Sequence, residues 1–200
     1  FCAPATLNEA VALLGGGDAS VMCGGTDLMV LMKEHVRQPR LVVDIKKIPG
    51  LDDFVFDPHA GLLIGALVTT RQVEISVMTR THYASLARAA TDFASVQVRN
   101  RATVVGNVCR ASPSADTLPP LIADRAVLRI HGPQGRRECA VEAFCSGPGR
   151  TVLAADEIVT HVAIPAPAPR TGKVYIKHGR RAQMELATGG VAVTLTLDGG

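Results

Sequence analysis

The apolar residues of this chain come in short runs that glycine and proline separate. The most apolar stretch, residues 61–68, is far shorter than the roughly 20 residues that a membrane-spanning helix needs. Nineteen glycines and twelve prolines among 200 residues indicate many turns. Because 47% of the residues are hydrophobic and only 20% are charged, the chain can bury a core and is not expected to be disordered. We therefore expect a globular protein of short helices and strands, without a membrane span.

The charge balance excludes several classes of partner. Twenty-one Lys and Arg residues against 18 Asp and Glu give a net charge of +3, which provides no strong attraction for nucleic acid or an anionic membrane. Tryptophan is absent and aromatic residues make up 4%, which disfavours a base-stacking surface. The five cysteines form no CxxC pair, so we expect neither a zinc nor an iron–sulfur site built by this chain alone. Scattered thiols favour a reducing compartment, and we expect a cytoplasmic protein.

The first 50 residues have the pattern of a strand–helix–strand lobe. Thr6 and Glu9 form a capping box, and apolar residues at helical spacing predict a helix that ends at the glycines 15–17. Strands are expected at 20–23 and 41–45, with a short helix from residue 28 between them.

A second lobe is expected over residues 51–170, after the turn Ile48-Pro49-Gly50. A proline-rich linker at 165–169 closes it, and residues 171–200 form a last segment. The patterns predict further helices at 69–78, 83–93 and 118–123, and further strands at 54–56, 62–68, 103–109, 127–130, 137–141, 158–164, 174–177 and 191–197. Since helices and strands alternate irregularly, the predicted class is α+β.

Two polar segments that contain glycine are candidate binding loops. Gly24-Gly25-Thr26-Asp27 lies between a predicted strand and a predicted helix, where glycines let the backbone approach an anionic ligand closely. This pattern is neither GxGxxG nor a Walker loop, so an ordinary glycine turn remains an alternative.

In the second segment Gly106 again permits close approach, while Asn107 and Ser112 offer hydrogen bonds. Asp116 could accept a hydrogen bond from a ribose hydroxyl. The alternative is a polar turn in which Ser112 and Asp116 cap the next helix, and both interpretations could hold together. A serine hydrolase is disfavoured, because no G-x-S-x-G elbow surrounds Ser112. A basic cluster at 177–181 could contact a phosphate or an electron-rich ring, or could be a solvated patch.

Several motifs in a fixed order resemble one known family. They are PATLNEA at 4–10, GGTDL at 24–28, IGA at 64–66, VRNRATVVGN at 98–107, ASPSADTLPP at 111–120, the strand at 158–165 and YIKHGRR at 175–181. The chain resembles the FAD-binding medium subunit, or FAD domain, of molybdenum hydroxylases such as xanthine dehydrogenase and carbon monoxide dehydrogenase. This resemblance implies a two-lobed, PCMH-type FAD-binding domain similar to that of vanillyl-alcohol oxidase.

The resemblance also assigns cofactor-binding roles. The first FAD loop would comprise Val21, Met22, Cys23, Gly24, Gly25, Thr26, Asp27 and Leu28, and the second would comprise Thr103, Val104, Val105, Gly106 and Asn107. Asp116 matches an acidic FAD ligand, and Phe93 matches an aromatic residue near the cofactor. Val159 matches an apolar flavin contact, and Lys177 matches a lysine near the isoalloxazine. Ser112 is added to these residues as a hydrogen-bond donor to a phosphate. No catalytic residue or metal ligand is expected in this chain. The family has two glycines before the asparagine, so the side chain of Val105 could crowd the pyrophosphate.

The implied function is electron transfer. Substrate would be oxidised at a molybdopterin centre on a large subunit, and electrons would pass through iron–sulfur clusters on a small subunit to FAD here and on to NAD, oxygen or another acceptor. Members of the family carry a further C-terminal domain, so residues 171–200 are expected to be its truncated start. The alternatives are a stand-alone flavin oxidase of the related type and a non-catalytic nucleotide-binding module.

Overall fold

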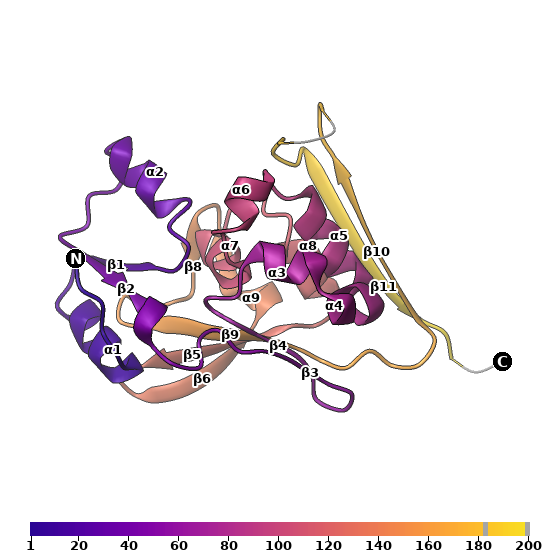
Figure 1. The fold of residues 1–200 in the computed structure, drawn as a ribbon, viewed down its shortest axis with the longest axis horizontal. Helices are drawn as coiled ribbons and strands as arrows, with labels where there is room; N and C mark the ends of the chain where they lie inside the picture. Colours follow the sequence, from indigo (N-terminus) through magenta and orange to yellow (C-terminus); the bar gives the residue numbers. More distant parts are fainter. Residues whose placement is uncertain (182–183, 199–200) are drawn as a thin grey trace.

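The fold is built around a five-stranded antiparallel sheet (Figure 1). A computed structural model describes residues 1–181 and 184–198. The strand order in the sheet is β3 (Phe54–Asp57), β4 (Gly61–Gly65), β9 (Ile158–Ile164), β5 (Val127–Gly132) and β6 (Gly135–Ala140). The strands predicted at 54–56 and 62–68 pair as the hairpin β3–β4, and those predicted at 127–130 and 137–141 pair as the hairpin β5–β6. Strand β9 pairs with both hairpins and so joins them.

The helices gather beside this sheet and the chain turns repeatedly between them. They are α1 (Leu7–Gly15), α2 (Leu28–Lys33), η1 (Ile45–Lys47, a 3-10 turn), α3 (Thr70–Ile75), α4 (Val77–His82), α5 (Ala84–Asp92), α6 (Val96–Arg99), α7 (Val104–Arg110), α8 (Leu118–Ala123) and α9 (Val141–Phe144). Helix α7 packs on β4 and β9, and two short strands, β7 (Cys145–Gly147) and β8 (Arg150–Thr151), follow α9. Together with the sheet, this mixture confirms the α+β class.

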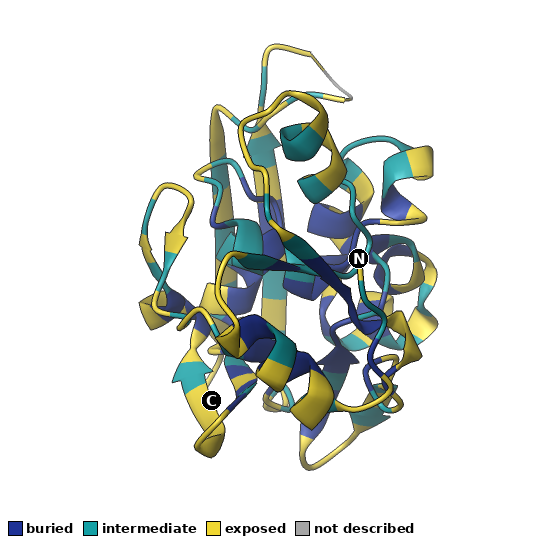
Figure 2. Ribbon diagram, turned by 90° about the vertical axis from the view of Figure 1, so that its left-hand side faces the viewer, coloured by how far each residue is buried: buried dark blue, intermediate teal, exposed yellow. Residues whose placement is uncertain are grey.

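The N-terminal part contains the expected strand–helix–strand arrangement. Strand β1 (Ala19–Met22) pairs in parallel with β2 (Leu41–Asp44), and α2 lies between them in the sequence. Thr6 caps α1 by accepting a hydrogen bond from the Glu9 amide, and the Glu9 carboxylate accepts one from the Ala5 amide. The buried face of α1 contacts β5 and joins the core of the large sheet. By contrast, α2 has no buried residue, and its residues are either intermediate or exposed (Figure 2).

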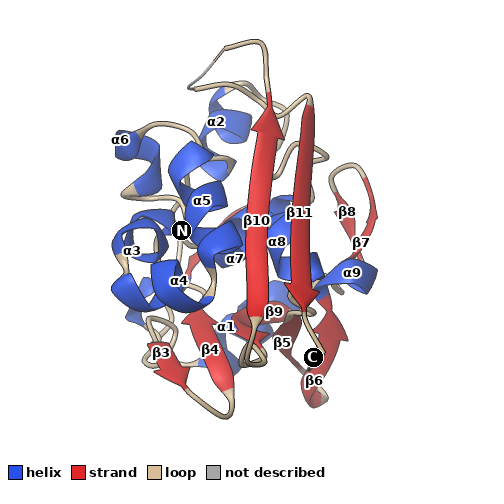
Figure 3. Cartoon of the chain, turned by 90° about the vertical axis from the view of Figure 1, so that its right-hand side faces the viewer, coloured by secondary structure: helices blue, strands red, loops and turns tan. Residues whose placement is uncertain are grey.

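A two-stranded ribbon covers the opposite side of the helices. Strands β10 (Thr171–His178) and β11 (Gly189–Thr196) pair antiparallel, and they lie across α5 and α8 (Figure 3). The predicted segment 171–200 includes residues 182–183 and 199–200, which lie outside the described residues. Across the part of the chain that the structure covers, no helix is long and apolar enough to cross a membrane.

Two predicted elements were wrong. The predicted strand at 103–109 is helix α7, where the Thr103 hydroxyl caps the first turn by accepting a hydrogen bond from the Gly106 amide. The β-branched Val104 and Val105 favour a strand locally, but burial against the sheet outweighs that weak preference. The predicted helix at 69–78 ends at Ile75, because Ser76 is extended and caps a separate helix, α4.

Candidate cofactor-binding cleft

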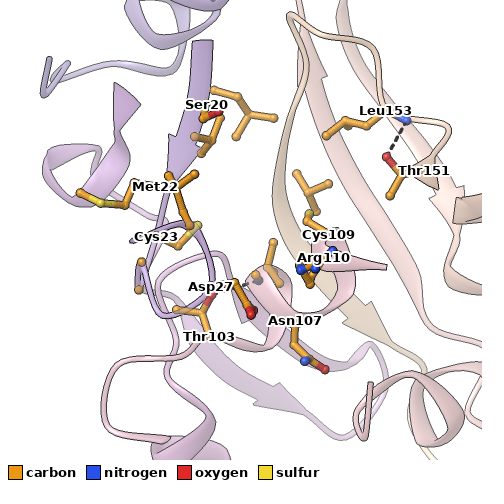
Figure 4. A pocket seen from close by; sticks show the side chains of 18 of the residues that line it. Ser20, Met22, Cys23, Asp27, Thr103, Asn107, Cys109, Arg110, Thr151 and Leu153 are labelled. Carbon is orange, nitrogen blue, oxygen red and sulfur yellow. Dashed lines mark hydrogen bonds between the residues drawn. The ribbon is translucent and has the colours of Figure 1, made fainter. Parts of the chain in front are cut away.

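A cleft of about 410 Å³ opens between the N-terminal strands and the larger sheet. Its walls come from β1 and the loop after it, from α7, and from the segment that precedes β9. Figure 4 shows Ser20, Met22 and Cys23 on one side and Thr151 and Leu153 on the other, with side chains of α7 between them. Three segments that are distant in the sequence therefore form one concave site, of the size typical for a small-molecule ligand.

The first wall is the loop 23–27, which is held tightly against the second loop. A Cβ atom on Gly24 would lie 1.8 Å from the carbonyl oxygen of Arg101, so this position has room for glycine only. Gly25 has a φ of +76°, a conformation that glycine adopts without strain. No described residue accepts a hydrogen bond from the amides of Gly24, Gly25 or Thr26. The wall thus offers consecutive backbone donors to a ligand.

The second wall is the start of α7. Thr103, Gly106 and Asn107 line the cleft there, and the Asn107 side chain is fixed by a 2.6 Å hydrogen bond from the Thr117 hydroxyl. Val105 also borders the cleft, but only 1% of its surface is exposed, because its side chain packs in the core. Crowding by the Val105 side chain is therefore slight, since almost none of it protrudes from the wall.

The third wall is a segment that the sequence patterns did not indicate as part of the site, although the residue after it, Val159, was predicted. It runs from Gly149 to Ile158 and includes the small residues Ala154 and Ala155. The remaining cleft residues that sequence reasoning missed are Leu14, Asp18, Ala19, Ser20, Leu31, Arg37, Ala102, Cys109 and Arg110. Small residues directly before a buried strand were the available signal for the third wall, because they leave room for a ligand beside the sheet.

The cationic side chains and thiols of the cleft differ in what they can offer a ligand. Arg37 and Arg110 bring positive charge to it. Burial raises the pKa of the Cys23 thiol to about 11, and burial likewise raises the pKa of Cys109. Both thiols are therefore protonated near neutral pH and act as small apolar groups.

Most of the predicted cofactor residues meet in this cleft. The structure brings together Val21, Met22, Cys23, Gly24, Gly25, Thr26, Asp27, Leu28, Phe93, Thr103, Val105, Gly106, Asn107 and Val159. Val104, Ser112, Asp116 and Lys177 lie outside its lining. The Ser112 hydroxyl accepts a hydrogen bond from the Ser114 amide, and Val104 is completely buried.

Asp116 belongs to a separate buried network at the ribbon. Its two carboxylate oxygens accept hydrogen bonds from the Tyr175 hydroxyl at 2.9 Å and from the Lys177 ammonium at 3.0 Å. Burial raises the pKa of Asp116, although Lys177 and Tyr175 oppose that shift by stabilising the carboxylate. The Lys177 ammonium also donates to the carbonyl of Asp92, the residue before Phe93, so the network lies directly behind one cleft residue. The idea that Ser112 and Asp116 cap α8 was wrong, since Thr117 occupies the cap position, and its hydroxyl bonds Asn107 instead of capping the helix.

Lys177 and the rest of the basic cluster face a second hollow of about 400 Å³. Its lining consists of Arg88, Asp92, Lys177, His178, Gly179, Arg180, Arg181 and Glu185. Ion pairs Arg88–Asp92 and Arg181–Glu185 neutralise part of its charge.

Comparison with known proteins places this architecture in a defined family. Residues 1–167 match the family model described as the FAD binding domain in molybdopterin dehydrogenase. The chain is 34% identical to the xanthine dehydrogenase FAD-binding subunit of Escherichia coli O157:H7 over 198 residues, which is 98% of this chain and 68% of the relative. It is 35% identical to the carbon monoxide dehydrogenase medium chain of Hydrogenophaga pseudoflava over 201 aligned positions, covering 100% of this chain and 69% of the relative.

Solved structures agree with this assignment. The carbon monoxide dehydrogenase of Hydrogenophaga pseudoflava superposes with a TM-score of 0.93 at 34% identity, covering 99% of this chain and 69% of the other. Quinoline 2-oxidoreductase from Pseudomonas putida 86 superposes with a TM-score of 0.90 at 27% identity, covering 99% and 68%. The chain therefore belongs to the family of FAD-binding domains of molybdopterin dehydrogenases, and it is an oxidoreductase subunit whose cofactor is FAD.

Proposed function

We propose that this chain holds FAD in the cleft between β1 and α7 and serves as the electron-transfer flavoprotein of a molybdenum-dependent hydroxylase or dehydrogenase. The observation that carries the proposal is the run of unbonded amides at Gly24, Gly25 and Thr26 on a cleft wall. A diphosphate needs such donors, and a glycine backbone lets it come close to them. The residues present therefore fit the cofactor that the family implies.

Each wall has a distinct task in this proposal. The loop 23–27 and the Thr103–Asn107 turn hold the diphosphate, and Arg110 adds positive charge. Phe93 and Val159 provide apolar surface that excludes water from the ligand and orients it. FAD supplies the redox chemistry when bound, and the protein contributes binding, orientation and tuning. Through its bond to the Asp92 carbonyl, the pair of Lys177 and Asp116 fixes the chain next to Phe93.

The electron path is proposed from the enzymes to which the relatives belong. Their names describe a xanthine dehydrogenase FAD-binding subunit and a carbon monoxide dehydrogenase medium chain. We infer a molybdopterin-binding large subunit and an iron–sulfur small subunit as partners, with NAD or another acceptor taking the electrons from this subunit. Such a complex would work in the cytoplasm.

We also propose that the cofactor domain has two lobes, residues 1–50 and 51–170, of the PCMH type. Parallel strands β1 and β2 with their connecting loops support the first lobe, and the five-stranded sheet with α7 supports the second. Helix α1 of the first lobe contacts β5 of the second, and this contact holds the two lobes together on either side of the cleft.

Titration of the purified apoprotein with FAD tests the proposal. Binding should quench flavin fluorescence and give a yellow protein with a flavin absorption spectrum. Gly25→Val should abolish binding, because its φ of +76° strongly disfavours valine. Gly172→Val is the matched control, since nothing lies within 4 Å of a Cβ at that exposed strand position. A wild-type protein that FAD neither colours nor stabilises would refute the proposal, and co-purification of a molybdopterin subunit would support the complex.

A further inference from the structure

A buried ion pair lies behind the cleft wall that carries Phe93. The Arg99 guanidinium donates from Nε to the Glu74 carboxylate at 2.8 Å, and both side chains are more than 90% buried. Arg71 contacts the same carboxylate at 3.0 Å. Burying such a pair costs desolvation that an apolar pair of similar volume would avoid, so its fixed geometry calls for a reason beyond stability.

The same guanidinium also hydrogen-bonds to the backbone at the cleft. Nη1 of Arg99 donates to the carbonyl oxygen of Phe93 at 2.7 Å and to that of Ala94 at 3.1 Å. Ala94 has a φ of +45°, a left-handed conformation that is unfavourable for a residue with a Cβ atom. Phe93, which precedes it, lines the cleft and is the one aromatic side chain that does so among the described residues. Arg99 therefore holds a strained turn whose first residue lines the cleft.

Helix α3 anchors both ends of this wall. At its first residue, the amide and hydroxyl of Thr70 both donate to the carbonyl oxygen of Ala102, which lies beside the second binding loop. One turn later Glu74 holds Arg99. Because α3 fixes residues 93–94 through Arg99 and residue 102 through Thr70, it sets the distance between Phe93 and the loop that begins at Thr103.

We propose that Arg99 is a positioning residue of the cofactor site, which, oriented by Glu74, places Phe93 against FAD without touching FAD itself. This inference rests on the proposed function, since it requires FAD in the cleft. A planar fork that donates to a carboxylate and two carbonyls cannot be reproduced by an ammonium group. Arg99 should therefore be irreplaceable by lysine for FAD binding, although lysine keeps the charge.

The test compares FAD affinity in variants that remain folded. Arg99→Lys should weaken FAD binding by about tenfold or more, since at least one charge-assisted hydrogen bond is lost from the wall. Arg129→Lys is the matched control, because its pair with Glu138 is exposed on β5 and β6 and lies outside the cleft lining, and it should bind FAD as the wild type does. Should Arg99→Lys fail to fold, Glu74→Gln, which keeps an oxygen acceptor, should show the same loss to a smaller degree.

A double-variant cycle with Phe93→Leu separates positioning from general stability. If Arg99 acts through Phe93, the two losses of affinity overlap, and Arg99→Lys adds little once Phe93 is leucine. The visible circular dichroism of bound flavin should also change alike in both single variants. Additive losses, or wild-type affinity in both Arg99→Lys and Glu74→Gln, would overturn the inference. Failure of the wild-type protein to bind FAD would instead overturn the proposed function, and the two failures are thus distinguishable.

Discussion

Substitution of Gly24 by alanine tests whether the two binding loops must touch. The added Cβ would lie 1.8 Å from the Arg101 carbonyl oxygen and 2.7 Å from its carbon. Since Cβ atoms essentially never come closer than 3.0 Å to another heavy atom, the loops must separate by about 1.2 Å. The obstacle is backbone rather than a flexible side chain, so no rotamer change can relieve it. Overpacking of this kind costs about 1–3 kcal/mol, and a cost of about 2 kcal/mol lowers the Tm of a chain of this length by roughly 4–8 °C.

The affinity for FAD should fall with the stability, because the displaced loop contains the free amides of Gly25 and Thr26. A shift of about 1 Å can cost roughly a hundredfold where positioning matters, so we expect Gly24→Ala to weaken FAD binding by at least about tenfold. Thermal unfolding followed by circular dichroism and fluorescence titration with FAD measure the two effects. Gly15→Ala is the control, since a Cβ there has no neighbour within 4 Å: it should leave the FAD affinity unchanged and should not lower the Tm. A Gly24→Ala protein with the wild-type Tm and wild-type affinity would show that the loops do not need this contact.

Three further predictions concern charges. Lys173→Met should destabilise the protein by about 3 kcal/mol, measured by urea unfolding, because it leaves the carboxylate of Asp124 buried without its cation; an unchanged unfolding midpoint would contradict this. Hydrogen bonding to Arg137 lowers the pKa of Glu157, so the folded state binds fewer protons than the unfolded state between the two pKa values. Near neutral pH the wild type should therefore be more stable than Glu157→Gln, and this difference should disappear as the pH falls below about 4.5 and through the lowered pKa of Glu157. A difference in unfolding free energy that stays constant across an acid series of unfolding curves would disprove the coupling. Arg110→Ala should weaken FAD binding by up to about fivefold at low salt and reduce its salt dependence, and equal salt slopes in both proteins would exclude a charge contact.

The predictable parts of the fold are those encoded within a few residues. The capping box at Thr6 and Glu9 and the two strands on either side of residues 57–61 are local signals, and the structure has each where the sequence indicates it. Helix α7 was missed because the preference of Val104 and Val105 for strands conflicts with their tertiary surroundings. The cap that begins the helix, Thr103 bonded to the Gly106 amide, was present in the sequence but is a weaker signal than two adjacent β-branched residues.

The candidate site shows the same division. Both loops that contain glycine were predicted, since close backbone approach leaves a signature in the residues themselves. The third wall, residues 149–158, carries no such signature, because its place depends on how β9 enters the sheet. The partners of Asp116 also could not be predicted from the sequence, since Tyr175 and Lys177 are 59 and 61 residues away along the chain. Only the docking of the ribbon brings them together.

The ribbon turns the polar face of β10 toward the helices. Alternation along β10 puts Lys173, Tyr175 and Lys177 on one face and Val174 and Ile176 on the other, and in an isolated amphipathic strand the apolar face would turn inward. In this structure the polar face turns inward: Val174 and Ile176 are 49% and 66% exposed, while the side chains of Lys173 and Lys177 are only 6% and 10% exposed. The reason is that β10 packs against two buried carboxylates, those of Asp124 and Asp116, which pair with the two lysines. The Lys173 ammonium also lies 4.6 Å from the centre of the Tyr83 ring. Turning the ribbon over would leave two buried acids without cations, a penalty that the burial of two aliphatic side chains could not offset. The acids thus fix the face of the ribbon, and through Asp116 they place Lys177 at the carbonyl beside Phe93.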